Sequence, residues 1–275
     1  MRRVNETMRL YLEAACGSSK GRIRVRNEDN FYFNRMTRMP ETENCMPPLF
    51  CVEASTAVCC GVFDGIGGAA DGQIASCIAA RTFQADCELA ESAGVLSEAL
   101  FEQMAEHMND AVCVAASRNV SNMGTTAAML GVCGDTVYIC NVGDSRVYRF
   151  RDGVLTQLSR DHAAAIPPFL EGKRKPALSQ WIGIPPEEMR IVPHIVRSSL
   201  ESGDVYLLCS DGLTDMVTDE GIASLLRLGG HADDAAQRLI NAALAAGGRD
   251  NVTVIVMMAA EAAQGRRGSG IRADK

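Results

Sequence analysis

Five acidic residues lie where apolar, strand-like segments begin or end. Asp64 follows the run VCCGVF, Asp211 follows YLLCS, and Asp250 precedes NVTVIV. Glu28 and Asp29 precede the aromatic segment NFYF. An aspartate of this kind, taken alone, is usually a turn residue, because its side chain hydrogen-bonds nearby backbone. Four separate segments with the same design instead favour one shared site, where the carboxylates would repel each other unless a cation held them.

The candidate ligands at such a site are all oxygen atoms, and no cluster of His or Cys accompanies them. Oxygen-only ligands suit Mg²⁺ or Mn²⁺ and not zinc or copper. Four or five carboxylates exceed the needs of one Mg²⁺, whereas two ions that share a bridging aspartate would account for them. Paired ions about 3.5–4 Å apart are a common arrangement for the hydrolysis of phosphate esters.

Two further features beside the carboxylates fit phosphate chemistry. Gly65 follows Asp64 directly, and glycine lets a backbone carbonyl approach a ligand closely. Arg24 lies shortly before Glu28 and Asp29, and a guanidinium near a metal–carboxylate cluster is suited to bidentate binding of phosphate. An alternative for Arg24 is a solvated strand charge, because neighbouring arginines alternate with it in the segment GRIRVR.

Composition narrows the class of protein. The chain has 275 residues, enough for one large domain or two small ones, and a net charge of −7. A two-metal nuclease is possible from the carboxylates alone, but the acidic charge and the lack of an aromatic, basic groove count against a nucleic-acid partner. The 11 cysteines show no regular pairing or CxxC spacing, which indicates free thiols in a reducing cytoplasm. No apolar run approaches the roughly 20 residues of a membrane span, and no signal peptide is expected.

The elements that must position these residues follow from hydrophobic periodicity. Strands are predicted at residues 9–16, 30–34, 57–63, 125–133, 136–142, 146–150, 154–158, 205–209 and 251–258. Helices are predicted at residues 72–90, 95–118, 220–228 and 234–246, with Ile74, Ile78 and Phe83 on the apolar face of the first and Asp234 capping the last. Strand-rich segments interrupted by two pairs of helices indicate an α+β domain with sheets inside and helices outside.

Seven motifs occur in a fixed order along the chain. They are GxxRxxNED from Gly21, FDGxGG from Phe63, MGTT from Met123, NVGDSR from Asn141, RDH from Arg160, CSDGLTD from Cys209 and RDNVTV from Arg249. In this order the motifs resemble those of the PPM family, the metal-dependent protein serine/threonine phosphatases of type 2C, in its compact bacterial form. The resemblance covers about residues 9–260.

The resemblance implies a four-layer αββα sandwich, in which two antiparallel sheets are flanked by antiparallel helix pairs. It implies a single phosphatase domain over residues 1–260, followed by a disordered tail at residues 261–275. The activity implied is hydrolysis of phosphoserine and phosphothreonine in proteins. Phosphoproteins would be the substrates, a bacterial serine/threonine kinase the functional opponent, and the cytoplasm the location, with no nucleic acid or membrane as partner.

The resemblance also assigns roles to the acidic residues. Asp64 would bridge two Mn²⁺ or Mg²⁺ ions, and the Gly65 carbonyl would bind one of them. Asp211 and Asp250 would ligate the second ion. Glu28 and Asp29 would act on the metal cluster either directly or through metal-bound waters. Arg24 would hold the phosphate while a water that bridges the two ions, with its pKa lowered, attacks phosphorus in line.

Three departures from the family pattern concern the details of the reaction. Ile66 stands where some eukaryotic members carry a His that protonates the leaving group, so a metal-bound water is expected to serve. Ser121 and Asn122 stand where many bacterial members carry an acidic residue, so a third metal site is expected to be absent or weaker. The flap segment after His162 is unusually short, and its basic run at residues 173–175 is either a solvated loop or an attraction for acidic phosphopeptides.

Two other functions stay open at the level of the sequence. One is a catalytically silent scaffold or sensor that binds phosphoproteins, which the presence of every core metal aspartate disfavours. The other is an enzyme with a narrower task, the dephosphorylation of an anti-sigma-type regulator. No attached sensor domain is visible in the sequence, which weakens this second alternative without excluding it.

Overall fold

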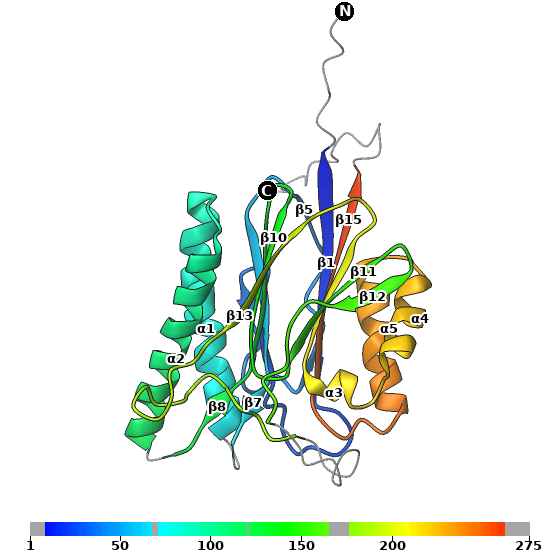
Figure 1. The fold of residues 1–275 in the computed structure, drawn as a ribbon. Coiled ribbons are helices and arrows are strands. Elements are labelled where there is room, and N and C mark those ends of the chain that lie inside the picture. The colour runs from blue at the N-terminus through cyan, green and yellow to red at the C-terminus, as the bar shows by residue number, and fades with distance from the viewer. Residues whose placement is uncertain (1–8, 68–70, 120, 165–175, 262–275) are drawn as a thin grey trace, which may run out of the picture.

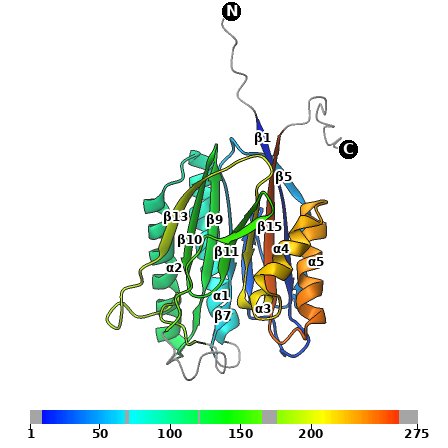
Figure 2. The same cartoon turned by 45° about the vertical axis from the view of Figure 1, so that its right-hand side comes forward.

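The computed structural model describes residues 9–67, 71–119, 121–164 and 176–261. Two antiparallel sheets pack face to face, and helices cover the outer face of each sheet (Figure 1). The view turned by 45° shows the same four layers, with one helical pair on either side of the sheets (Figure 2). The α+β architecture expected from the sequence is therefore confirmed.

The first sheet has seven strands and contains both the first and the last strand of the described chain. Its members are β1 (Leu10–Ser19), β4 (Asn44–Cys45), β5 (Phe50–Glu53), β11 (Arg146–Arg151), β12 (Val154–Gln157), β14 (Val205–Cys209) and β15 (Val252–Glu261). Their spatial order is β12-β11-β14-β15-β1-β4, and β5 also pairs with β1. β1 and β15 pair along their whole length, from Leu10 opposite Glu261 to Ser19 opposite Val252.

The second sheet has six strands in the order β13-β10-β9-β6-β2-β3. They are β2 (Asn30–Phe33), β3 (Met36–Thr37), β6 (Val58–Phe63), β9 (Ala127–Cys133), β10 (Thr136–Val142) and β13 (His194–Ser199). A small two-stranded sheet joins β7 (Gly65–Ile66) to β8 (Gly124–Thr125) just beyond the end of β6. In Figure 1 it lies at the lower end of the sandwich, the same end at which the short helix α3 (Asp211–Thr214) is found.

Four longer helices form the outer layers. They are α1 (Asp71–Ala93), α2 (Glu98–Asn119), α4 (Asp219–Arg227) and α5 (Ala232–Ala245). α1 and α2 cover the second sheet, and α4 and α5 cover the first (Figure 1). Three separate clusters of buried side chains fill the spaces between the layers: one under α1 and α2, one between the two sheets, and one under α3 to α5. Burial of apolar surface in these clusters, at roughly 25 cal/mol per Å², is the main force that holds the layers together.

Most predicted elements are confirmed, with shifts of a few residues at their ends. The strands predicted at 136–142 and 205–209 have those bounds in the structure. The predicted strand at 125–133 is divided, because Thr126 lies between β8 and β9. The strand β13, at one edge of the second sheet, was not predicted from the sequence, nor were the short strands β3, β4, β5 and β7.

Two details of the helix predictions are wrong. Ile74 is 40% exposed, because alanines such as Ala75 and Ala79 form the buried face of α1 instead. Helix α5 begins at Ala232 with His231 as its N-cap, so Asp234 lies within the first turn and is not the cap. The predicted tail falls outside the described residues beyond Glu261, and the basic run at 173–175 also lies outside them. Among the described residues, no helix is long and apolar enough to cross a membrane.

Candidate metal centre

The acidic residues singled out in the sequence come together at one end of the sandwich, and both sheets contribute them. Asp64 follows β6 of the second sheet, while Asp211 and Asp250 lie beside β14 and β15 of the first. Burial raises the pKa of Asp64 well above its usual range, and the charges of Asp211, Asp29 and Asp250 raise it further. Carboxylates that raise one another's pKa in this way lie close enough together to bind a shared group of cations.

The backbone around Asp64 is fixed by the segment that leads into β9. The Asp64 N–H donates to Thr126 Oγ1 at 3.0 Å, and the Asp64 carbonyl accepts from the Thr126 N–H and from Thr125 Oγ1, both at 2.8 Å. Because each backbone group of Asp64 is held, its side chain leaves the strand in one direction. The two threonines of the MGTT motif therefore fix the backbone at the end of β6 through hydrogen bonds.

Gly65 is a glycine because α1 begins directly against it. A Cβ at this position would lie 2.2 Å from the Gly72 carbonyl oxygen and 2.6 Å from the Glu28 carbonyl oxygen. Real Cβ atoms do not approach backbone atoms so closely, so the segment that carries Glu28 and the start of α1 would both have to move. The close approach explains why a buried strand is followed by bare backbone.

Substitution of Gly65 by Ala is expected to lower the melting temperature by several degrees and to remove most of the ability to bind divalent cations. The added methyl overpacks a site that is backbone on both sides, which typically costs about 1–3 kcal/mol. Calorimetric titration with Mn²⁺ and thermal unfolding monitored by circular dichroism would measure both effects. Gly134→Ala, at a turn with φ +65° where a Cβ would meet nothing within 4 Å, is the control for metal binding: it strains the backbone without a clash and should leave Mn²⁺ affinity unchanged. Unchanged Mn²⁺ affinity in Gly65→Ala would contradict the packing argument.

Asp29 is fully buried behind the strand ends. Its Oδ2 accepts hydrogen bonds from Ser210 Oγ and from Thr253 Oγ1, both at 2.7 Å. Burial raises the pKa of Asp29 to about 7, although these two hydrogen bonds lower it. Its Oδ1 is also buried and has no hydrogen-bond partner among the residues that the structure describes. A buried carboxylate oxygen without a partner is costly, so it is available to a cation or to an ordered water.

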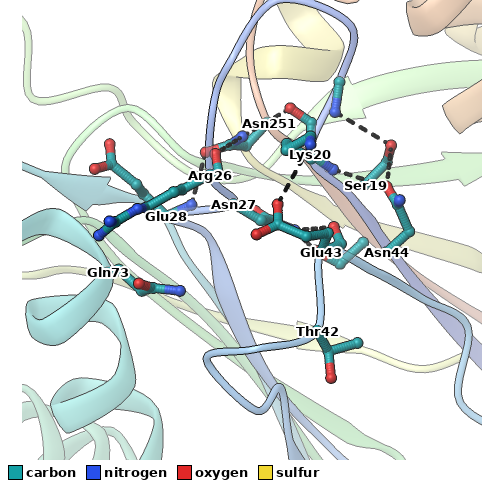
Figure 3. A network of polar contacts seen from close by, with 12 residues as sticks. Ser19, Lys20, Arg26, Asn27, Glu28, Thr42, Glu43, Asn44, Gln73 and Asn251 are labelled. Atoms are coloured by element: carbon teal, nitrogen blue, oxygen red, sulfur yellow. Dashed lines mark hydrogen bonds and ion pairs between the residues drawn. The ribbon is translucent and has the colours of Figure 1, made fainter. Parts of the chain in front are cut away.

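Asn251 ties three segments together next to the site (Figure 3). Its Nδ2 donates to the carbonyls of Lys20 and Arg26, at 2.8 and 2.9 Å, and its Oδ1 accepts from the Glu28 N–H at 2.8 Å. One amide side chain thus closes the loop between residues 20 and 26 and sets the position of Glu28. Burial raises the pKa of Glu28, while the charge of Arg24 lowers it.

Arg38 is a fully buried arginine that holds the segment carrying Glu28 and Asp29. Its Nε donates to the Asp29 carbonyl at 2.7 Å, its Nη2 to the Asn27 carbonyl at 2.6 Å, and its Nη1 to the Thr42 carbonyl at 2.7 Å. No carboxylate lies within ion-pair distance of it in the described part of the chain, and burial lowers its pKa. The guanidinium therefore acts as a multiple donor to backbone carbonyls on either side of Glu28.

Arg24 reaches the site from the exposed loop before Glu28. Its Nη2 lies 2.5 Å from Asp250 Oδ2, and about half of its side chain is exposed. Burial and the charge of Asp211 raise the pKa of Asp250, while the ion pair with Arg24 opposes this shift. Arg24 thus places a positive charge directly beside Asp250.

The donor set fits a hard divalent cation, although it is not a finished coordination shell. In the ranges that the structure describes, no three His, Cys, Asp or Glu side chains are gathered tightly enough to hold an ion as they stand. The reason is visible in the contacts: Asp250 turns to Arg24, and one oxygen of Asp29 turns to two hydroxyl groups. The oxygen-only ligands, their mutual effect on pKa and the unpartnered Asp29 Oδ1 all agree with Mn²⁺ or Mg²⁺.

Comparison with known proteins agrees with this geometry. A sequence model of the protein phosphatase 2C family matches residues 44–246. The chain belongs to the protein phosphatase 2C family. It is 32% identical over 255 residues to the serine/threonine protein phosphatase PstP of Mycobacterium tuberculosis, with 90% of this chain and 45% of PstP covered. The chain therefore spans less than half the length of that relative.

Two further comparisons cover nearly the whole of the similar protein. The serine/threonine phosphatase stp of Listeria innocua is 27% identical over 262 residues, which cover 90% of this chain and 95% of stp. The solved structure of the PstP catalytic domain, in complex with two manganese ions, has a TM-score of 0.71 and 29% identity, with 91% of this chain and 99% of that structure covered. The fold of this protein phosphatase 2C chain is thus shared with solved family members.

The GDSR and RDH motifs of this protein phosphatase 2C chain form a polar network beside the metal end. Arg146 binds Asp161 through Nε and Nη2, at 3.0 and 2.7 Å to Oδ2, and His162 Nδ1 accepts from the Gly143 N–H at 3.1 Å. Burial lowers the pKa of His162, which favours the neutral ring that can accept this bond. Asp144 belongs to the same turn, and its charge contributes to the raised pKa of Asp64.

The acidic residues predicted from the sequence lie in this region, and two residues that were not predicted, Asn251 and Arg38, hold the segment that carries Glu28 and Asp29. Asn251 was recognised only as part of the RDNVTV motif, and nothing in the sequence indicated that its side chain joins loop residues far away in the chain. Arg38 lies in a segment for which the sequence predicts neither a helix nor a strand. An arginine in a stretch rich in proline and polar residues gives no signal of burial, because arginine is mostly exposed in proteins.

Proposed function

We propose that this chain hydrolyses phosphoserine and phosphothreonine in proteins with the help of two Mn²⁺ or Mg²⁺ ions. The observation that carries the proposal is the meeting of Asp64, Asp211 and Asp250 from two different sheets, with Arg24 beside them. Membership of the protein phosphatase 2C family and similarity to enzymes named serine/threonine phosphatases support it.

The residues divide into two groups by task. The ions would be held by Asp64, the Gly65 carbonyl, Asp211 and Asp250. Glu28 and Asp29 would bind the ions directly or through water. When bound, two such cations supply a water of lowered pKa as the nucleophile and neutralise charge on the phosphoryl oxygens. Ser210 and Thr253 keep one oxygen of Asp29 engaged, so that its other oxygen keeps a fixed direction.

Arg24 would orient the phosphoryl group. Its contact with Asp250 uses Nη2, and a guanidinium carries five N–H donors, so donors remain for phosphate oxygens. The exposed half of the side chain places it on the solvent side of the carboxylates, where a phosphorylated residue arrives. Ile66 cannot donate a proton to the leaving alkoxide, so in this chain a water would have to deliver that proton.

The biological setting proposed follows from the same activity. A serine/threonine kinase would phosphorylate the proteins that this chain dephosphorylates, in the cytoplasm, where the free thiols stay reduced. Within this chain, the phosphatase domain would end near residue 260. Ser121 and Asn122 offer no carboxylate for a third ion, so we propose two ions per site.

Removal of divalent cations is expected to abolish activity. Release of phosphate from p-nitrophenyl phosphate and from a phosphothreonine peptide would be measured with Mn²⁺, with Mg²⁺ and with excess EDTA. Turnover should fall to background in EDTA and return when either ion is restored, because the carboxylates alone repel a phosphate dianion.

Two outcomes would count against the proposed function. Turnover that persists in EDTA would exclude the metal-dependent reaction. A folded, metal-loaded protein that binds phosphopeptide and releases no phosphate would favour the alternative of a silent phosphoprotein-binding scaffold. Binding of Mn²⁺ measured by calorimetry separates this second outcome from a failure to load the ions.

A further inference from the structure

A basic loop, defined as residues 20–26 with the sequence KGRIRVR, lies at the rim of the metal centre. Its two apolar side chains point into solvent: Ile23 is 69% exposed and Val25 is 85% exposed. Single exposed apolar residues are common on protein surfaces. Here, however, the two alternate with Arg22, Arg24 and Arg26, so that five consecutive exposed residues combine apolar contact area and positive charge.

The backbone of the basic loop is fixed at several points. Asn251 Nδ2 binds the carbonyls of Lys20 and Arg26, and thus closes the loop at both ends (Figure 3). The Arg22 N–H donates to the Gly248 carbonyl at 2.7 Å, and Gly21 packs so closely on Asp250 that a Cβ would lie 2.1 Å from its carbonyl oxygen. A loop held in this way presents its side chains to a partner with little loss of entropy on binding.

Several positive charges of the basic loop are not neutralised by ion pairs within the described part of the molecule. Arg22, Arg26 and the nearby exposed Arg249 make no ion pair with a carboxylate of the described residues, whereas Lys20 is paired with Glu43 at 3.8 Å. Figure 3 shows the Arg26 side chain extending away from the Asn251 amide. The chain as a whole carries a net charge of −7, so this group of cations is a local exception.

The position of the basic loop relates it to the phosphate. Arg24, at its centre, contacts Asp250 of the metal centre, and Glu28 follows two residues after the loop ends. The loop bends at residues 22–23 and again at 25–26, and the exposed side chains of Ile23 and Val25 directly flank Arg24 in the chain. A peptide whose phosphorylated side chain reaches Arg24 would therefore pass over Ile23 and Val25.

We propose that Arg22–Arg26 and Arg249 form a docking surface for the substrate segment that flanks the phosphorylated residue. This segment is an extended peptide that carries acidic side chains, for the arginines, and an apolar side chain, for Ile23 or Val25. The inference rests on the proposed phosphatase function and adds the substrate class. Nucleic acid fits the surface less well, because the described loop offers no aromatic side chain for base stacking.

The test compares three substrates that share one reaction. They are p-nitrophenyl phosphate, a phosphothreonine peptide with acidic and apolar flanks, and the same peptide with glycine and serine flanks. The variants are Arg22→Ala with Arg26→Ala, Ile23→Ser with Val25→Ser, and the charge-conserving Arg22→Lys with Arg26→Lys. Arg197→Ala, an exposed arginine on β13 of the other sheet, controls for the loss of positive charge.

The wild type is expected to prefer the acidic, apolar peptide about tenfold in kcat/KM, mainly through KM, and to lose this preference at high salt. Two double variants, Arg22→Ala with Arg26→Ala and Ile23→Ser with Val25→Ser, should each lose most of this preference. Both should still hydrolyse p-nitrophenyl phosphate with a kcat/KM within twofold of wild type. The double variant Arg22→Lys with Arg26→Lys should retain most of the preference for the acidic, apolar peptide. Fluorescence anisotropy of the unphosphorylated acidic peptide should show the same order of binding without any turnover.

Three results would overturn the docking surface. Equal kcat/KM for both peptides in the wild type, with p-nitrophenyl phosphate hydrolysed normally, would contradict it and leave the phosphatase function intact. Variants that lose activity equally on all three substrates would show that the loop acts by supporting the metal centre. Variants that lose binding to anionic vesicles or to single-stranded RNA, with peptide kinetics unchanged, would assign the surface to another class of partner. No turnover on any substrate by the metal-loaded wild type would instead be a failure of the proposed function.

Discussion

Substitution of Asp64 by Asn is expected to lower kcat by about three orders of magnitude while raising the thermal stability of the metal-free protein. The loss of activity is expected because Asp64 is the carboxylate that we propose bridges the two ions. Weakened metal binding would remove several kcal/mol of transition-state stabilisation, and each 1.36 kcal/mol corresponds to a factor of ten in rate. Asn has the same size and shape as Asp, so little else changes.

The gain in stability has a different cause. Burial and the charges of Asp211, Asp29 and Asp250 all disfavour the ionised form of Asp64, and its pKa is raised accordingly. A neutral amide relieves this repulsion, which should raise the melting temperature in EDTA by about 2–4 °C, as for about 1 kcal/mol in a domain of this size. Wild type should gain more than the variant from added Mn²⁺, so the order of stability should reverse when metal is supplied.

Thermal unfolding in EDTA and in Mn²⁺, together with steady-state kinetics, would check both parts. Asp110→Asn, on the exposed face of α2, is the matched control and should change neither. A metal-free Asp64→Asn variant that is less stable than wild type would show that Asp64 has a structural role that outweighs the repulsion. Unchanged kcat would remove Asp64 from the metal centre.

Substitution of Arg38 by Met is expected to lower the melting temperature by about 10 °C or more and to weaken Mn²⁺ binding at least tenfold. Met fills much of the same space but leaves the carbonyls of Asn27, Asp29 and Thr42 without their donors. Each buried acceptor left unsatisfied costs about 1–3 kcal/mol. The segment that carries Glu28 and Asp29 would then lose its anchor, so both stability and metal affinity should fall.

Arg81→Met, at an exposed position on α1, removes the same charge without removing buried hydrogen bonds and should change the melting temperature by less than about 2 °C. Calorimetric titration with Mn²⁺ below the unfolding transition separates the effect on the site from the effect on stability. A variant that is less stable yet binds Mn²⁺ like wild type would limit Arg38 to a structural role. Wild-type stability would contradict the hydrogen-bond argument altogether.

The parts of the fold that sequence could predict are those in which one local signal is strong. The strand β10 has turn residues at its start and an uninterrupted β-prone run, and α2 has a clear apolar stripe that includes Met104, Met108 and Val112. The edge strand β13 was missed, because its residues His194–Ser199 alternate weakly and its pairing with β10 is fixed by tertiary contacts. Edge strands of this kind carry little periodic hydrophobic signal.

The candidate site shows the same division. The acidic residues could be predicted because four separate segments each place a carboxylate where an apolar run begins or ends, although any one of them alone would fit a turn. The contacts that orient them could not be predicted, because they join residues far apart in the chain: Ser210 and Asp29 are 181 positions apart, and Asn251 and Lys20 are 231 apart. Hydrogen bonds of this kind depend on which strands become neighbours, which no short stretch of sequence states.

The pairing of β1 with β15 also determines how the molecule would respond to mechanical tension. Leu10 and Glu261 are register partners at the end of the sheet that lies away from the metal centre. Force applied at these two residues would separate the strands one residue pair at a time. It would not load all the interstrand hydrogen bonds together in shear. The last pair to open would be Ser19 with Val252, next to the loop that carries Arg24 and to Asp250. The metal centre would therefore remain intact under tension until this pair of strands had come apart.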